Sequence, residues 1–291
     1  MKISSLLIGV FAALVFSMNA SANTIDLFTD PDGGQTVTDD SNGAEADDGE
    51  NFSEVGSYTT IIGGYRDLKA DAISGASNNG GGCQVADDCT VLRVLDGRLT
   101  FNNDTGVTGI GIVQWDGQDS SSDLDYTGLG GENLYTQEGC PAGGCDRFVF
   151  TVYESDQGFP FLVGIYTDDT HYTEFLLAAE AASEAGGTSY VNVLLFTFFE
   201  NAEALGLCDG IGLPTGVLDV NCGADGDANL ADVGALQVIL NPDGSTQTVA
   251  VDLEIGGITK TGVPEPGILA LLGMGFAAGG LVRARRRRQS N

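Results

Sequence analysis

The chain has 291 residues, of which 42% are hydrophobic and 8% aromatic, so it holds enough apolar material for a folded core and is not a disordered polypeptide. Glycine occupies 43 positions, a frequency that disfavours long helical bundles. Between residues 23 and 263 forty acidic side chains face only six basic ones, and such a negative body repels phosphate backbones, which excludes nucleic-acid binding.

The N-terminus has the three zones of a secretory signal peptide. Met1 and Lys2 form a short positive region, residues 6–16 form an apolar stretch, and Ala20-Ser21-Ala22 is a small-residue cleavage site. We therefore expect residues 1–22 to form a signal helix that is removed after export. The mature chain is then expected to begin at Asn23.

The next segment is strongly acidic. Nine Asp and Glu residues fall between residues 29 and 54, with few apolar residues among them. Such a composition buries too little apolar surface to offset the entropy of ordering. We expect residues 23–56 to be a flexible, solvated segment that precedes the folded domain.

The body, residues 57–262, has the pattern of an all-β domain. Short runs rich in β-branched and aromatic residues recur between clusters of Gly, Asn and Asp, which predicts a β-sandwich or jelly-roll-like fold. Asp96-Gly97 is a two-residue hairpin signal between two of these runs. The predicted strands are 58–62, 66–73, 90–95, 98–102, 107–115, 148–154, 161–167, 190–199, 233–240 and 246–255.

One stretch of the body departs from this pattern. Residues 172–185 are rich in Leu, Ala and Glu and are followed by Gly186-Gly187, which predicts a short helix with a glycine stop. A strand followed by a shorter helix is the alternative.

The six cysteines fall in three local pairs. These are Cys83 with Cys89, Cys140 with Cys145, and Cys208 with Cys222. An even number of cysteines in an exported chain indicates disulfides, and local closure is the simplest of the fifteen connectivities. Zinc binding is disfavoured because no C-x-x-C pair occurs and His171 is the only histidine.

A run of oxygen-bearing side chains is a candidate Ca²⁺ site. It comprises Asp225, Asp227, Asn229 and Asp232. It is not an EF-hand loop, because Leu230 occupies the sixth position where glycine is required. Residues 30–33 and 116–125 are comparable acidic fragments. Structural Ca²⁺ and plain solvated turns both remain open, and no other cofactor is indicated.

No catalytic residue is identified. Carboxylate pairs such as Glu132 with Glu154, or Asp116 with Asp168, cannot be told from surface charge in so acidic a chain. His171 lacks any nucleophile motif around it, and a loop histidine near a strand end is the simpler interpretation. We therefore expect a protein that is not an enzyme.

The C-terminus has three parts in a fixed order. Val263-Pro264-Glu265-Pro266 comes first, and the uncharged run 267–282 follows. The third part is the arginine-rich tail 283–291. The run predicts a short transmembrane helix, and the positive-inside rule places the tail in the cytoplasm. The membrane-orienting cluster is Arg283, Arg285, Arg286, Arg287 and Arg288.

This C-terminal region, 263–291, closely resembles the PEP-CTERM sorting signal. The resemblance rests on Val263-Pro264-Glu265-Pro266, the apolar span and the arginine cluster. Gly267 departs from the pattern, since a Ser, Ala or Thr is more usual there. The resemblance implies recognition by an exosortase, a membrane-embedded processing protease, and a Gram-negative envelope.

Together these features predict a surface or extracellular matrix protein. We expect it to cross the inner membrane, to be held there briefly by its C-terminal helix, and to reach the cell surface or the medium. The resemblance implies a structural or adhesive role in an exopolysaccharide or biofilm matrix. The alternatives are a secreted glycan-active hydrolase and a Ca²⁺-dependent carbohydrate-binding module with the same sorting tail.

The sorting motif supplies a first prediction. In a host with the processing protease, Glu265→Ala is expected to leave a heavier, membrane-held species, because the two prolines keep Glu265 extended and accessible outside the bilayer. Membrane fractionation and mass measurement of the product test this. Replacement of the arginines by alanine is the comparison. If the Glu265 variant is trimmed like the parent while the arginine variant is not, recognition depends on the topology of the span.

Overall fold

The computed structural model describes residues 23–30, 33–39, 51–74, 89–104, 106–136, 140, 144–155, 158, 160–178, 180, 182–183, 189–244 and 251–262. The signal peptide 1–22 and the C-terminal region 263–291 lie outside the described residues, and so does Cys83. Within the described ranges, none of the helices combines the length and apolar character needed to span a membrane.

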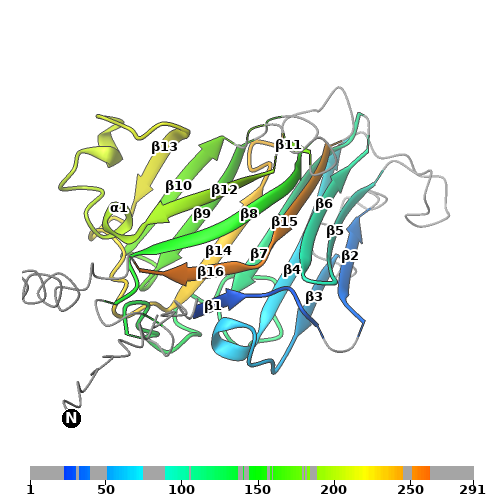
Figure 1. Cartoon of the computed structure of the whole chain (residues 1–291), viewed down its shortest axis with the longest axis horizontal. Coiled ribbons are helices and arrows are strands. Elements are labelled where there is room, and N and C mark those ends of the chain that lie inside the picture. The colour runs from blue at the N-terminus through cyan, green and yellow to red at the C-terminus, as the bar shows by residue number, and fades with distance from the viewer. Residues whose placement is uncertain are drawn as a thin grey trace, which may run out of the picture.

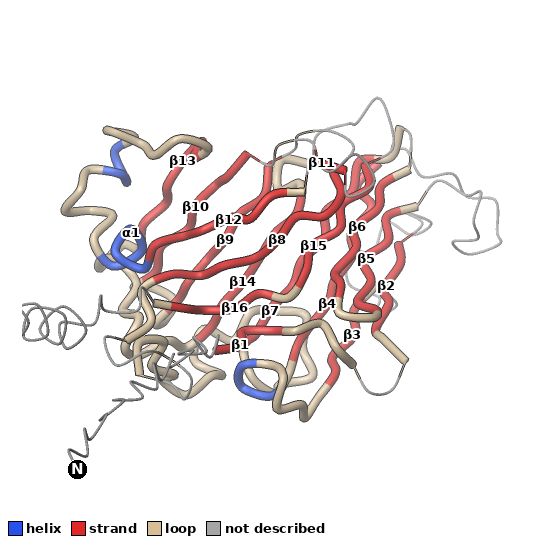
Figure 2. Tube along the Cα trace, viewed as in Figure 1, coloured by secondary structure: helices blue, strands red, loops and turns tan. Residues whose placement is uncertain are grey.

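The domain consists of two antiparallel β-sheets packed face to face (Figures 1 and 2). The nine-stranded sheet contains β1 (Asn23–Asp26), β2 (Gln35–Asp39), β5 (Thr90–Leu95), β6 (Arg98–Asn103), β8 (Arg147–Ser155), β11 (Ala182–Ser183), β12 (Tyr190–Leu195), β15 (Val251–Gly256) and β16 (Ile258–Thr261). Its main path runs β1-β16-β8-β15-β6-β5-β2, with β11 and β12 paired to β8. The all-β, sandwich-like fold predicted from the sequence is confirmed.

The seven-stranded sheet runs in the order β13-β10-β9-β14-β7-β4-β3. Its strands are β3 (Phe52–Val55), β4 (Arg66–Ser74), β7 (Thr108–Trp115), β9 (Pro160–Tyr166), β10 (Tyr172–Ala178), β13 (Val217–Cys222) and β14 (Ala235–Leu240). Three short helical turns complete the described elements: η1 (Ile62–Gly64), α1 (Phe196–Glu200) and η2 (Leu207–Asp209).

Period-two patterning explains why these segments form strands. In β5, Thr90, Leu92 and Val94 are buried, and the residues between them are half-buried or exposed. The hairpin from β5 to β6 turns at Asp96-Gly97, where both residues have positive φ, 51° and 82°. This confirms the hairpin signal, because a two-residue turn with positive φ at both positions matches the twist of the strands.

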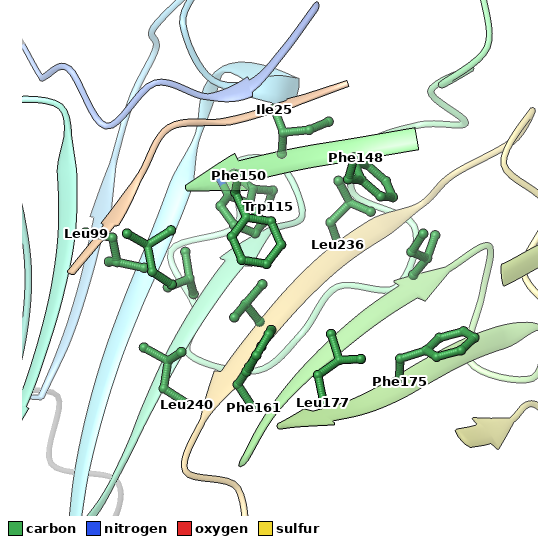
Figure 3. Packing of buried hydrophobic residues seen from close by; sticks show 14 of the residues in the cluster. Ile25, Leu99, Trp115, Phe148, Phe150, Phe161, Phe175, Leu177, Leu236 and Leu240 are labelled. Carbon is green, nitrogen blue, oxygen red and sulfur yellow. The ribbon is translucent and has the colours of Figure 1, made fainter. Parts of the chain in front are cut away.

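Side chains from both sheets meet in one hydrophobic core (Figure 3). Phe150 of β8 contacts Phe161 of β9 edge to face, with ring centroids 6.1 Å apart. Trp115, at the end of β7, is 1% exposed. Such aromatic pairs add specific geometry to the apolar burial that holds the sheets together.

Residues 172–178 correct a prediction, because they form strand β10 and not a helix. Thr173, Phe175 and Leu177 are buried, whereas Tyr172 and Glu174 between them face outward. The pairing of β10 with β9 and β13 overrides the weak helix propensity of Leu, Ala and Glu. Residues 182–183 form β11, and 184–188 lie outside the described residues.

The helix α1 occupies the end of the predicted strand 190–199, which is therefore shorter than expected. Phe196 and Phe199 lie on one face of this turn and are both buried. Phe196 contacts Phe148, and Phe199 contacts Phe175, each with ring centroids 4.7 Å apart. The predicted strand at 58–62 is also absent, since these residues lead through a turn into η1.

The acidic segment 23–56 is a second correction. Its strands β1, β2 and β3 pair with β16, β5 and β4, so the segment is part of the folded domain. The composition was misleading because a few buried apolar residues are enough to attach this segment to the core. Ile25, Phe28 and Val37 are each at most 3% exposed. Residues 40–50 lie outside the described residues.

Two of the three expected disulfides lie wholly within the described residues and are confirmed. Cys140 pairs with Cys145, with Cα atoms 5.1 Å apart, just before β8. Cys208 of η2 pairs with Cys222 of β13, with Cα atoms 5.8 Å apart. Cys89 is also disulfide-bonded, and its expected partner Cys83 lies outside the described residues.

A polar network is buried between the two sheets around Arg66 of β4. The guanidinium donates to both carboxylate oxygens of Asp26 in β1, at 3.1 and 2.9 Å, and pairs with Asp30. Its Nε donates to Oε1 of Gln35 in β2 at 2.9 Å. Trp115 donates from its indole nitrogen to Asp26 at 2.9 Å. The network therefore ties β1 and β2 of one sheet to β4 and β7 of the other.

This network predicts a large loss of stability on removing Arg66. Arg66→Met is expected to lower the free energy of unfolding by about 3–5 kcal/mol, because it leaves the carboxylates of Asp26 and Asp30 buried without a counter-charge. Denaturant unfolding at neutral pH measures this loss. Arg93→Met, which replaces an exposed arginine in β5, is the matched control. A loss below about 1 kcal/mol, the usual value for an exposed pair, would show that the network is not needed.

Candidate functional site

The outer face of the seven-stranded sheet carries a row of residues, one from each strand, that are polar except for Gly164 of β9. The registers of neighbouring strands align them side by side across the whole sheet. We call this the polar row: Asn221, Glu174, Gly164, Gln237, Gln114, Asp67 and Glu54. Each member alternates with inward residues of its strand, so these side chains point away from the core.

The aromatic end of the row lies on β9, β10 and β13. Tyr166 and Tyr172 are directly opposite each other, and their ring centroids are 5.7 Å apart. The hydroxyl of Tyr166 donates to Oε1 of Glu174 at 2.6 Å, and the amide of Asn221 donates to Oε2 at 2.8 Å. Glu174 is therefore held from both sides, although it remains half-buried and within reach of solvent.

Gly164 explains how Tyr166 lies on the sheet. A Cβ at Gly164 would come within 2.5 Å of the Tyr166 hydroxyl oxygen, so the ring folds along the strand over the glycine. Tyr166 is consequently only 3% exposed. Burial, followed by the nearby Glu174 carboxylate, raises the pKa of Tyr166, which keeps its hydroxyl protonated and donating.

A third tyrosine comes from the loop that follows β7. Tyr126 contacts Tyr166 edge to face, with ring centroids 5.3 Å apart, and is 38% exposed. The loop passes so close to β14 that a Cβ at Gly234 would overlap the backbone oxygens of Tyr126 and Thr167. Tyr126, Tyr166 and Tyr172 thus form one aromatic group beside Glu174.

The other end of the polar row is acidic. We call Glu54, Asp67, Asp116 and Asp119 the acid cluster. Single carboxylate oxygens of Glu54, Asp67 and Asp119 lie within 4.8 Å of one another. Asp116 follows the last residue of β7, and its carboxyl group interacts with that of Asp67. Asp67 and Gln114, which are opposite each other in β4 and β7, join the cluster to the rest of the row.

Hydrogen bonds shape the loop around the acid cluster. Glu54 accepts from the backbone N–H groups of Asp119 and Ser120, at 3.1 and 2.9 Å. Asp116 accepts from the backbone N–H of Asp125 at 2.9 Å through Oδ2. Two of the four acids therefore fix the loop 116–125 against the ends of β3 and β7.

The innermost oxygens of the cluster have no hydrogen-bond partner. These are both carboxylate oxygens of Asp67, Oδ1 of Asp116 and the neighbouring Oε1 of Gln114. Asp67 and Asp116 are each 1% exposed, and Gln114 is 3% exposed. With Asp67 protonated, its carboxyl group hydrogen-bonds to that of Asp116, and Oε1 of Gln114 still lacks a partner. With both acids ionised, all of these buried acceptors lack one, which costs free energy.

Burial and like charges raise the pKa values of the two innermost acids. Burial above all, then a hydrogen bond between the carboxyl groups of Asp67 and Asp116 and the charges of Asp116, Glu54 and Asp119, together raise the pKa of Asp67 to about 9. Burial also raises the pKa of Asp116 to about 6, although the hydrogen bond from Asp125 opposes this. A carboxyl group so placed prefers to be neutral unless a positive charge compensates it.

The structure does not bring the sequence-predicted calcium residues into one cluster. The carboxylate of Asp227 accepts from the backbone N–H of Glu203, and Asn229 Oδ1 accepts from the N–H of Ala231. Asp225 and Asp232 are exposed, and the three aspartates do not converge within the described part of the chain. Asp227 does lie near Cys208 and Cys222, but both sulfurs are in a disulfide.

Other sequence candidates have local partners. His171 lies at the end of the β9–β10 hairpin and contacts Asp168 through Nδ1 at 3.0 Å. Hydrogen bonds from Thr170 and His171 lower the pKa of Asp168. Glu154 lies in β8 of the nine-stranded sheet, whereas Glu132 bridges to Val233 beside β14 of the other. The sorting motif and the arginine cluster lie outside the described residues.

Sequence reasoning missed Glu54 and Asp67. It named Asp116 in an unsupported pair with Asp168, and it included Asp116 and Asp119 only within the acidic fragment 116–125. One signal was present: Asp67, Lys69 and Asp71 alternate as polar residues with the apolar inward positions of β4, which places Asp67 on the outer face. The signal does not reveal that β3 and the loop 116–125 carry acids to the same place, because those contacts depend on strand order.

No protein-family model and no curated protein matches the sequence. Among solved structures, a family 11 carbohydrate-binding module from Clostridium thermocellum, in complex with a β-1,3-1,4-mixed-linked tetrasaccharide, aligns with a TM-score of 0.29. It is 9% identical, and the alignment covers 79% of this chain and 96% of the module. An agarase aligns with a TM-score of 0.32 at 10% identity, over 74% of this chain and 24% of the agarase. The chain thus spans about a quarter of the agarase, and TM-scores of this size transfer no activity to it.

The raised pKa values predict a specific pH dependence of stability. Because the pKa of Asp67 is higher in the folded chain than in the unfolded chain, the folded state holds more protons between about pH 4 and pH 9. The contribution of Asp67 to stability is therefore lost as pH rises through this window. Glu54, Asp116 and Asp119 repel the ionised form, and Lys69, two residues along β4, is the nearest basic residue on the same face of the strand, since Arg66 faces the core.

In chelator-treated buffer, Asp67→Asn is expected to unfold at a higher temperature than the parent at pH 8 and to show a weaker decline from pH 5 to pH 9. Thermal melts across this range measure both quantities. Asp123→Asn, an exposed acid in the same loop, is the control and should follow the parent. Parallel pH profiles for the parent and Asp67→Asn would contradict the assignment.

Proposed function

We propose that the chain is an exported, non-catalytic protein that binds neutral glycan chains on the aromatic end of the polar row. The observation that carries this proposal is the group of three tyrosines placed beside a doubly anchored Glu174. Tyr126 and Tyr172 offer aromatic surface that solvent reaches, and Glu174 and Asn221 offer polar groups next to it.

These residues match the two needs of sugar recognition. A pyranose ring presents an apolar face of C–H groups, which packs on an aromatic ring, and an edge of hydroxyl groups, which needs donors and acceptors. Glu174 accepts and Asn221 both donates and accepts, and their orientations are fixed by Tyr166 and by each other. Groups held in place before binding lose little entropy when a ligand arrives.

The charge of the chain favours a neutral ligand. The formal net charge is −29 at pH 7, and five of the twelve basic residues lie in the C-terminal cluster. An acidic polysaccharide would be repelled at long range by such a body. Neutral chains of an exopolysaccharide matrix are therefore the ligand class that we propose.

Export and sorting belong to the same proposal. The signal peptide 1–22 would direct export across the inner membrane. The Pro264-Glu265-Pro266 element would then be recognised by an exosortase-type protease. The released domain would then act at the cell surface or in the matrix. This part of the proposal is supported by the sequence patterns alone.

A glycan hydrolase is less well supported than a binding protein. Asp67 and Asp116, the acids with raised pKa values near neutrality or above, are each 1% exposed, so a polysaccharide cannot reach them. Glu174, which a glycan could reach, accepts from Tyr166 and Asn221 and has no second carboxylate in the polar row beside it. A pair of accessible carboxyl groups is needed for the usual hydrolysis mechanism.

The test is binding of the purified full chain to an array of neutral and acidic glycans, followed by titration with the best ligand. Tyr172→Ala and Glu174→Gln are each expected to weaken binding by about tenfold or more, because each removes a central contact of the surface. Tyr153→Ala, which removes a tyrosine of β8 in the other sheet, is the control. Absence of any glycan binding by the parent, or loss only with the control variant, would overturn the proposal.

A further inference from the structure

When its two inner acids are ionised, the acid cluster has buried acceptors without a hydrogen-bond partner. Both oxygens of Asp67 are buried and accept no hydrogen bond, and the same holds for Oδ1 of Asp116. Gln114, which is not an acid and is 3% exposed, directs an unpartnered Oε1 from the position directly opposite Asp67. Unsatisfied buried acceptors of this kind require an explanation, and a bound cation is one that satisfies all of them at once.

The surrounding structure holds these oxygens in position. Glu54, Asp67 and Gln114 lie on three adjacent strands in direct register, which restricts where their side chains can reach. Asp116 and Asp119 come from the loop that Glu54 and Asp116 fix through backbone hydrogen bonds. Oxygens of Glu54, Asp67 and Asp119 therefore converge, with Asp116 in contact with Asp67 and Gln114 beside Asp67 on the neighbouring strand.

The donor atoms select the class of ion. Every donor is a carboxylate or carboxamide oxygen, and no cysteine or histidine belongs to this group. An all-oxygen set suits a hard cation, and soft metals such as zinc prefer nitrogen and sulfur. An irregular set of oxygens from strands and a loop suits Ca²⁺, which tolerates variable geometry, better than Mg²⁺, which requires a near-ideal octahedron.

We propose that the acid cluster binds one Ca²⁺ ion, with Asp67 as its central ligand. Asp67 can supply two ligand oxygens, and Asp116 and Gln114 one each. Glu54 and Asp119 would supply the other ligand oxygens. The positive charge of the ion would offset the repulsion among the four acids. The ion would also hold the loop 116–125 against β3 and β4. This site is distinct from the sequence-predicted run at Asp225–Asp232.

The first experiment is calorimetric titration of the purified full chain, freed of metal by a chelator, with CaCl₂. We expect one ion per chain, with a dissociation constant of about 10⁻³ M or lower, as in other extracellular calcium modules. Saturating Ca²⁺ should raise the unfolding temperature, since a ligand that binds only the folded state stabilises it. Trp115, the only tryptophan of the sequence, immediately precedes Asp116 and gives a fluorescence signal next to the site.

Four variants locate the ion. Asp67→Asn and Asp116→Asn are each expected to weaken Ca²⁺ binding by at least tenfold and to remove the rise in unfolding temperature. Asp119→Asn, at the half-buried edge of the cluster, should weaken binding less. Asp232→Asn, in the sequence-predicted run, is the matched control and should bind Ca²⁺ like the parent.

Folding of the variants is checked by melts in chelator, where Asp67→Asn should be at least as stable as the parent because one of four repelling acids is neutral. The proposal is overturned if the parent binds no Ca²⁺ at millimolar concentration, in which case a proton shared by Asp67 and Asp116 satisfies the cluster. It is equally overturned if binding survives Asp67→Asn and Asp116→Asn but is lost in Asp232→Asn. None of these readouts involves a glycan, so they are independent of the function proposed above.

Discussion

The guanidinium of Arg66 is buried between the sheets, and an arginine in that position must be surrounded by acceptors. Asp26, Asp30 and Gln35 supply them from the N-terminal segment, and Arg66 itself belongs to the opposite sheet. Because a buried charge without its partner is very costly, β1 and β2 are held at the positions that complete this network. The indole of Trp115 adds a donor to Asp26, which connects the network to the aromatic core. The two sheets are thus joined by polar contacts as well as by apolar packing.

Strand β4, which carries Arg66 on its inner face, carries Asp67 among other acids on its outer face. Strand alternation turns Arg66 inward and Asp67 outward, so consecutive residues of β4 have contrasting surroundings. The inner charge is matched by two carboxylates, whereas the outer carboxylate is buried among other acids and has no hydrogen-bond partner. The first arrangement is balanced in charge within the chain, although Oδ1 of Asp30 lacks a partner, whereas the second gathers acids alone. We therefore assign a ligand from outside the chain to the second.

The polar row connects the two ends of the outer face. Its aromatic end is satisfied by internal hydrogen bonds between Tyr166, Glu174 and Asn221, which leave rings and polar edges accessible. Its acidic end is unsatisfied and hardly accessible. A large flexible ligand suits the first end and a small ion suits the second. The loop after β7 contributes to both, through Tyr126 and through Asp119.

Local patterns in the sequence determined the strands β4 to β9, the Asp96-Gly97 hairpin and the two disulfides that close short loops, because each depends on residues near one another in the chain. The export and sorting signals that we propose at the two termini rest on local patterns of the same kind. Tertiary structure alone decided that residues 172–178 form a strand between two others, and that the acidic segment contributes β1, β2 and β3. It alone also assembled the acid cluster, in which Glu54 and Asp119 are 65 residues apart in the sequence. Strand order and register bring such residues together, and neither can be inferred from local propensity, because pairing is decided by contacts across the whole domain.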